Sequence, residues 1–161
     1  MDWVGAEMSA TTRITLDPKA HPVPILIHDE RDLRRFIERR LDGLAHTSQI
    51  ESHETSAGIP DFNIFMDGRD VWVELKVLSD RKPPKMRPTQ RRWHNDRWAN
   101  GGMSWVLAYD LDDDILLVIP GHTAAGLDRR VASWRAAGSP RNIEEIVDVI
   151  KSLTKRIRNG K

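Results

Sequence analysis

Two acids and one amine, Asp61, Glu74 and Lys76, stand in two short segments, 61–66 and 71–77, in which apolar and polar residues alternate. Side chains two residues apart lie on the same face of a strand, so the three groups share one face if the segments pair as a hairpin. Two carboxylates about 5–8 Å apart repel each other unless a cation lies between them. Such oxygen ligands suit a hard divalent ion, Mg²⁺ or Mn²⁺.

The register of this hairpin depends on the turn at Asp67-Gly68, a dipeptide typical of tight hairpin turns. A two-residue turn places Asp61 directly across from Glu74, whereas a four-residue turn places it across from Lys76. Both registers keep the three groups on one face. A lysine beside a metal-bound water can orient that water or stabilise charge on a phosphate. A salt bridge between strands on a solvated face is the alternative interpretation of the same residues.

The other face of the hairpin is entirely apolar and should lie on a core. Its residues are Phe62, Ile64, Met66, Val71, Val73, Leu75 and Val77.

Further elements are predicted from hydrophobic periodicity and from helix start and stop signals. We expect helices at 29–44, 88–100, 123–137 and 141–157, and strands at 48–54, 104–109 and 115–119. Together with the hairpin they predict a mixed α/β domain with a central sheet. The stripe of Ile143, Ile146, Val147, Ile150 and Leu153 predicts that the last helix covers either its own sheet or a partner subunit.

Composition narrows the class of protein. The chain has 161 residues, which suits one domain, and it has no cysteine, which excludes disulfides and thiolate chemistry. It has no apolar run long enough to span a membrane and no signal-like start, so a cytoplasmic location, in a phage-infected or bacterial cell, is the expectation. The net charge is only +1, yet residues 81–100 hold seven arginines and lysines and one acid. A basic stretch of this kind predicts contact with a polyanion.

The run Gly58-Ile59-Pro60-Asp61 followed by Glu74-Leu75-Lys76 resembles the PD-(D/E)XK nuclease motif. Gln90, Trp93 and Gly101-Gly102 lie where its virus-type replication-repair branch (VRR-NUC) has a glutamine, an aromatic residue and a glycine. The resemblance covers about residues 30–110 and favours a metal site over a salt bridge.

This resemblance implies a restriction-endonuclease-like fold, in which a central mixed sheet is flanked by helices. It implies that Asp61, Glu74 and the carbonyl of Leu75 bind Mg²⁺ or Mn²⁺. It also implies that Lys76 acts on the attacking water and that Gln90 supports the site.

The family also resembles archaeal-type Holliday junction resolvases, which carry an acid in the first helix. Glu30 falls on the stripe of Leu33, Ile37 and Leu41, toward the sheet, whereas Glu38 points away from it. We therefore expect Glu30 to join the catalytic group; an acid that only favours the helix dipole is the alternative.

The expected organisation is an irregular arm at 1–27, a nuclease core at 28–122 and a C-terminal helical extension at 123–161. The expected DNA-binding residues are Arg81, Lys82, Lys85, Arg87, Arg91, Arg92 and Arg97.

The predicted activity is that of a metal-dependent DNA endonuclease acting on branched or junction DNA, and such nucleases are frequent in phage and DNA-repair contexts. A homodimer would be needed to cut two strands symmetrically. The alternatives are an exonuclease or another DNA-processing nuclease of the same fold, such as a restriction enzyme, and a non-catalytic DNA-binding accessory protein.

Overall fold

The computed structural model describes residues 26–51, 58–79 and 84–156. A six-stranded mixed sheet runs through the centre of the described chain, with strand order β1-β2-β3-β4-β5-β6. Neighbouring strands are antiparallel except β3 and β4, which are parallel. The strands are β1 (His46–Gln49), β2 (Phe62–Met66), β3 (Arg69–Leu78), β4 (Trp105–Asp110), β5 (Ile115–Pro120) and β6 (Ser139–Arg141).

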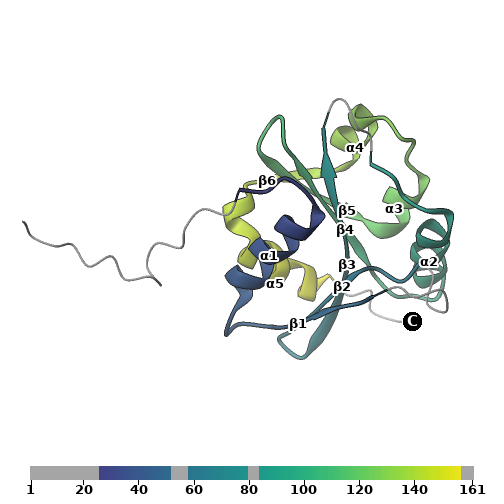
Figure 1. Ribbon diagram of the computed structural model, residues 1–161. Coiled ribbons are helices and arrows are strands. Elements are labelled where there is room, and N and C mark those ends of the chain that lie inside the picture. The colour runs from purple at the N-terminus through teal and green to yellow at the C-terminus, as the bar shows by residue number, and fades with distance from the viewer. Residues whose placement is uncertain (1–25, 52–57, 80–83, 157–161) are drawn as a thin grey trace, which may run out of the picture.

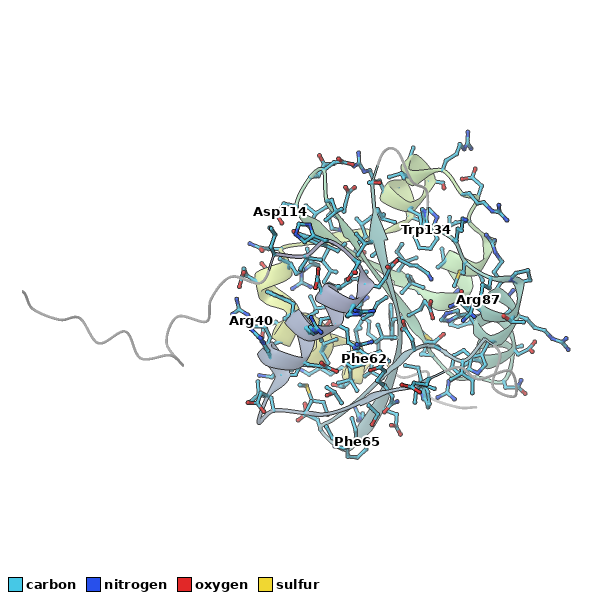
Figure 2. The ribbon with its side chains drawn as sticks, in the orientation of Figure 1. Arg40, Phe62, Phe65, Arg87, Asp114 and Trp134 are labelled. Carbon is cyan, nitrogen blue, oxygen red and sulfur yellow. The ribbon has the colours of Figure 1, made fainter. Side chains whose placement is uncertain are left out.

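Helices cover both faces of this sheet (Figure 1). On one face lie α1 (Glu30–Leu41) and α5 (Ile146–Lys155); on the other lie α2 (Pro88–Ala99), α3 (Gly121–Gly126) and α4 (Val131–Ala137). Figure 2 shows Phe62 on the side of α1 and α5 and Arg87 on the side of α2. The structure therefore confirms a mixed α/β architecture with a central sheet between helices.

The hairpin of β2 and β3 has the two-residue turn. Asp67 and Gly68 both have positive φ, 54° and 75°, as a tight primed turn requires. The pairing of Phe62 with Val73 and of Met66 with Arg69 fixes the register. The predicted apolar face lies in the core under α1 and α5, with Phe62, Ile64 and Val73 fully buried.

The helix α1 forms where its sequence predicts it. Its N-cap, Asp29, accepts a hydrogen bond from the backbone N–H of Asp32 at 2.9 Å, an interaction worth about 1 kcal/mol. Its apolar stripe is buried against the sheet; it consists of Leu33, Phe36, Ile37 and Leu41. The helix ends at Leu41, three residues before the predicted end, and Gly43 follows with φ 74°.

The region after β5 differs from the prediction of one helix at 123–137. The chain forms two short helices, α3 and α4, because Asp128 turns it between them. The carboxylate of Asp128 accepts hydrogen bonds from the N–H of Arg130 at 2.9 Å and the hydroxyl of Ser133 at 2.6 Å. These bonds satisfy groups at the start of α4, whereas α3 has already ended at Gly126.

Ser139 and Pro140, expected to lie between two helices, and Arg141, expected to begin the last helix, form the edge strand β6 instead. Pro140 is tolerated there because β6 pairs only with β5. After it, a short 3-10 helix, η2 (Ile143–Glu145), leads into α5, which begins at Ile146 rather than near 141.

The other boundaries shift less. The strand expected at 48–54 is β1 at His46–Gln49, and residues 52–57 lie outside the described part of the chain. Of the expected N-terminal arm at 1–27 only the last two residues are described, and Ile27 is buried in the core. The apolar stripe of α5 packs on its own sheet beside α1: Ile146, Val149, Ile150 and Leu153 are buried there.

A substitution at Gly58 tests how closely the segment before β2 packs against α2. Its φ is 97°, and a Cβ at this position would lie 2.2 Å from the backbone oxygen of Thr89. We expect Gly58→Ala to cost about 2–4 kcal/mol of the free energy of unfolding, because neither backbone can move away cheaply. Urea denaturation followed by circular dichroism measures the change, with Gly126→Ala as the control, since nothing lies near a Cβ at that position. An unchanged midpoint in Gly58→Ala would contradict this packing.

Candidate active site

Asp61 and Glu74 face each other across the start of the β2–β3 hairpin. The observed register continues from the Phe62–Val73 pair and places Asp61, the residue before β2, opposite Glu74. The backbone oxygen of Asp61 accepts from the N–H of Ile50 at 2.9 Å, so its backbone faces away from β3. Asp61 and Glu74 thus form a non-hydrogen-bonded pair, the kind in which opposed side chains lie closest.

One oxygen of Glu74 is fully engaged. Its Oε1 accepts from Nζ of Lys76 at 2.7 Å and from Nε2 of Gln90 at 2.6 Å. The orientation of the Gln90 amide is fixed, because its Oε1 accepts from the backbone N–H of Arg87 at 2.9 Å. Glu74, Lys76 and Gln90 are all buried, with 1%, 8% and 5% of their surface exposed. The structure thus brings together three of the predicted site residues in one hydrogen-bonded group.

The remaining buried carboxylate oxygens lack partners. Among the described residues nothing donates a hydrogen bond to Oδ1 of Asp61 or to Oε2 of Glu74. Burial, followed by the negative charge of Glu74, raises the pKa of Asp61 to about 6, and the nearby Lys76 opposes this rise. Asp61 therefore lies where burial and the charge of Glu74 disfavour its ionised form unless a positive charge is added.

The free edge of β3 contributes backbone groups to the same place. The N–H of Leu75 hydrogen-bonds to the Asp61 carboxylate and lowers its pKa. In a strand the N–H and carbonyl of one residue point to the same side, so the Leu75 carbonyl faces this edge as well. Pro60 lies opposite Leu75 in the observed register and has no N–H to offer that carbonyl.

Glu30 lies at the rim of this arrangement. Its Oε1 accepts from the backbone N–H of Val77 at 3.4 Å, two residues beyond Leu75 on the same edge of β3. The helix that carries it covers the opposite face of the sheet from Glu74 and Lys76. Glu30 is therefore directed toward the sheet, as its helical position predicts, but its hydrogen bond is to the backbone of β3, whereas those of Glu74 are to Lys76 and Gln90.

A buried histidine completes the polar layer beneath α2. His94 is wholly buried, and its Nδ1 lies 2.7 Å from the hydroxyl of Ser104. Burial, followed by the positive charge of Lys76, lowers the pKa of His94 to about 4, so the ring is neutral at pH 7. The contact leaves no room for a side chain at Gly121, where a Cβ would lie 2.2 Å from Nδ1 of His94.

The sequence indicates that His94 shares a helix face with Gln90, but it does not reveal the partnership with Ser104. The one available signal is a serine placed directly before the apolar strand β4.

The predicted DNA-binding residues fall into four groups. Arg81 and Lys82 lie outside the described residues, whereas Lys85, Arg87 and Arg92 are exposed. Arg91 has a structural role, because its guanidinium donates to the carbonyls of Ala125 at 2.8 Å and Leu127 at 3.0 Å and so ties α2 to α3. Arg97 is partly buried and lies over two tryptophan rings.

A hard cation fits the donor set. Two buried carboxylate oxygens without partners and a backbone carbonyl lie at one strand edge, and Mg²⁺ is commonly held by one or two carboxylates while it keeps several waters. Within the described ranges no three histidine or acidic side chains converge closely enough to hold a metal by themselves. Asp61, Glu74 and the Leu75 carbonyl would therefore hold such an ion together with water.

No protein-family model matches this sequence, and no curated protein matches it. Among the described residues, no helix has the length and apolar character needed to cross a membrane.

Removing the charge of Asp61 should stabilise the metal-free protein. The folded-state pKa of about 6 exceeds the ordinary value of 3.8, so the native state binds more protons between those values and loses stability as the pH rises through them. We expect Asp61→Asn to raise Tm by about 3–6 °C at pH 7.5 and to change it little at pH 4. Thermal denaturation at both pH values in EDTA checks this, and an equal shift at both would contradict it.

The Asp61→Asn variant also tests whether a divalent cation binds at this site. Mg²⁺ or Mn²⁺ should raise the Tm of the wild type and leave that of Asp61→Asn nearly unchanged, because an ion stabilises only the state that binds it. Ca²⁺ serves as a second hard ion, and NaCl of equal ionic strength is the control.

His94 should contribute the opposite pH dependence. The unfolded ring takes up a proton near pH 6.5 and the native ring only near pH 4, so stability falls as the pH drops through this window. The Asp61→Asn background removes the opposing slope of the carboxyl. In that background we expect urea midpoints to fall from pH 6.5 to pH 4, and a further His94→Gln substitution should flatten this fall. An unchanged slope would show that the ring titrates normally.

Proposed function

We propose that this protein is a metal-dependent DNA phosphodiesterase of the PD-(D/E)XK class, with a restriction-endonuclease-like fold. The observation that carries the proposal is the pair of buried, unpartnered oxygens on Asp61 and Glu74. They lie beside a lysine and a glutamine that already bind the other oxygen of Glu74. A salt bridge alone would need neither the second carboxylate nor the buried glutamine, and burying them without a ligand is costly.

The proposed reaction is direct hydrolysis of a phosphodiester bond. When bound, Mg²⁺ or Mn²⁺ would stabilise charge on the phosphate and lower the pKa of water. Lys76 is held by Glu74 through one of its three donors, so its ammonium can orient the attacking water and stabilise the charged transition state. Gln90 keeps Glu74 in position through its own backbone contact at Arg87.

The substrate would approach along the C-terminal end of β3. A cleft of about 1060 Å³ opens there, next to Lys76 in sequence, and its lining includes Glu30, Val77, Lys85 and Arg129. Lys85 and Arg129 supply positive charge for backbone phosphates, which would give salt-dependent binding with little sequence readout. Branched DNA, such as a four-way junction or a flap, is the substrate that the family resemblance favours.

A symmetrical cut in two strands would require two copies of this single site, hence a homodimer. The stripe of α5 is already covered by its own sheet, so a dimer would use another surface. The exposed apolar side chains of Leu44 and Phe65, near the β1–β2 edge, are 53% and 44% exposed and belong to such a surface in this proposal.

Glu74→Gln and Lys76→Ala test the activity. Each should reduce Mg²⁺-dependent cleavage of labelled DNA by at least about 10²-fold. Glu74→Gln removes the negative charge that would bind the metal ion, and Lys76→Ala removes the positive charge that would stabilise the reacting phosphate. Binding to the same DNA in EDTA should change by less than about 3-fold, since the phosphate contacts remain. Asp70→Asn is the matched control, an exposed acid on the same strand that should cleave normally.

The assay uses a panel of linear duplex, flap, four-way junction and closed circular DNA. Cleavage of closed circles or junctions would identify an endonuclease, and cleavage confined to free ends an exonuclease. Full activity in both variants would overturn the proposed site. Normal DNA binding by the wild type without cleavage or metal uptake would instead indicate an accessory protein.

A further inference from the structure

Two tryptophans and an arginine gather on the face of the sheet that carries the candidate active site. The rings of Trp72 and Trp93 lie 5.8 Å apart, tilted by 51°. The guanidinium of Arg97 lies over both, 5.8 Å from the centre of Trp72 and 5.6 Å from that of Trp93. We call Trp72, Trp93 and Arg97 the aromatic–basic cluster.

Its side chains are only partly buried. Trp105 and Trp134, by contrast, are core residues with 4% and 1% of their surface exposed. Core packing therefore explains Trp105 and Trp134 and leaves the partly exposed pair, Trp72 and Trp93, without a role in the core.

Arg97 is held in place by its surroundings. Its Nε donates to the carbonyl of Met103 at 3.3 Å. A Cβ at Gly102 would lie 2.9 Å from Cγ of Arg97, so the absence of a side chain at 102 makes room for this conformation. No ion pair to Arg97 is found among the described residues, and its terminal nitrogens remain available for a ligand.

A hollow of about 470 Å³ opens beside this cluster. Its lining is Trp93, Asp96, Arg97, Asn100, Gly101 and Gly102, and the carboxylate of Asp96 pairs with the guanidinium of Arg92 at 3.6 Å. The hollow offers a flat aromatic ring, a planar cation and polar groups, which is the combination that holds a stacked base and its phosphate. Its volume falls in the range of small-ligand sites.

The cluster is adjacent to the candidate active site on both elements that build it. Trp72 precedes Glu74 by two residues on the same face of β3, a separation of about 7 Å along the strand. Trp93 follows Gln90 by one turn of α2 and its ring lies 5.5 Å from that of His94. A nucleotide bound here would therefore neighbour the phosphate at the reacting position.

We propose that the aromatic–basic cluster binds an unpaired nucleotide of the substrate, with the base stacked on Trp93 and a phosphate held by Arg97. The inference rests on the proposed function and narrows its substrate class to DNA with an unpaired nucleotide next to the cut. A base inside a duplex is stacked on its neighbours and has no free face for the ring of Trp93, so flaps and frayed or overhanging ends meet this requirement and continuous duplex does not.

The test compares a blunt fluorescein-labelled duplex with the same duplex carrying a short dT overhang at its 3′ or 5′ end. Affinities are measured by anisotropy in EDTA, so that no cleavage is needed. We expect the wild type to prefer one overhang over the blunt duplex by about 10-fold, the value of stacking one base. Trp93→Ala and Arg97→Ala should each remove most of this preference, and the dT overhang should quench tryptophan fluorescence in the wild type.

Matched variants separate stacking from charge and from folding. Arg92→Ala removes an equal charge from an exposed residue of the same helix, which pairs with Asp96 at 3.6 Å, and it should weaken both probes alike, so that the ratio persists. Trp93→Phe retains an aromatic face, so it should keep most of the affinity ratio between overhang and blunt duplex while reducing the quenching of tryptophan fluorescence. If Trp93→Ala fails to fold, Trp93→Phe and Arg97→Gln together test the nucleotide site.

The two proposals fail in different ways. A wild type without overhang preference, or an unchanged ratio in folded Trp93→Ala and Arg97→Ala, would overturn the nucleotide site, even if cleavage still depends on Glu74. A ratio that responds to both substitutions, in a protein that cleaves no DNA with Mg²⁺ or Mn²⁺, would uphold the nucleotide site and overturn the phosphodiesterase.

Discussion

The close approach of Asp61 and Glu74 is the interaction on which the rest of this structure depends. Two carboxylates that face each other in a largely buried place destabilise the fold unless positive charge reaches them, and Lys76 and Arg34 offset this only in part, since the pKa of Asp61 stays raised. The fold nevertheless holds them together, because the apolar face of the same hairpin is locked into the core. A one-residue slip would relieve the acids but expose that whole face, so hydrophobic burial enforces an electrostatically unfavourable arrangement.

The two faces of the sheet bury different kinds of side chain. The face under α1 and α5 is a hydrophobic core of conventional kind. The face under α2 buries polar groups, since the buried residues of that helix are Gln90 and His94. Hydrophobic burial therefore does little to fix α2, and hydrogen bonds take its place: Arg91 ties the helix to carbonyls of α3 and its C-cap, and Gln90 ties it to β3. Such hydrogen-bonded polar layers fix geometry closely, which a reacting centre requires. In this layer Oε2 of Glu74 and Nε2 of His94 have no partner among the described residues.

Much of this arrangement is encoded locally and was therefore predictable. The hairpin, its turn, and the shared face of Asp61, Glu74 and Lys76 follow from alternation and from Asp67-Gly68. Other features depend on tertiary partners. Ser139–Arg141 has no strand signal and pairs because β5 presents a free edge. The stripe of α5 shows that one face is buried, but periodicity cannot say whether its own sheet or another subunit covers it.

The candidate site shows the same limit. The alternation of side chains along a strand predicted which acids share a face. It could not choose between the two turn lengths, and only the observed register places Asp61 opposite Glu74. The burial of His94 depends on Ser104 and on the absence of a side chain at Gly121, residues far from it in sequence. A histidine on a polar helix carries no signal of either contact.

A row of side chains on β3 packs against a row of side chains on α2, along a line that we call the seam. This packing explains why the proposed catalytic and substrate-binding residues are neighbours. Trp72, Glu74 and Lys76 follow the two-residue period of a strand. Gln90, Trp93, His94 and Arg97 follow the three- and four-residue spacing of one helix face. Two contacts join the rows: Trp72 meets Trp93, and Glu74 meets Gln90. Because both rows are polar or aromatic where a core would be aliphatic, core stability does not account for them. The nucleic-acid ligand that we propose, running along the seam with its base at one end and its phosphate at the other, would account for both rows.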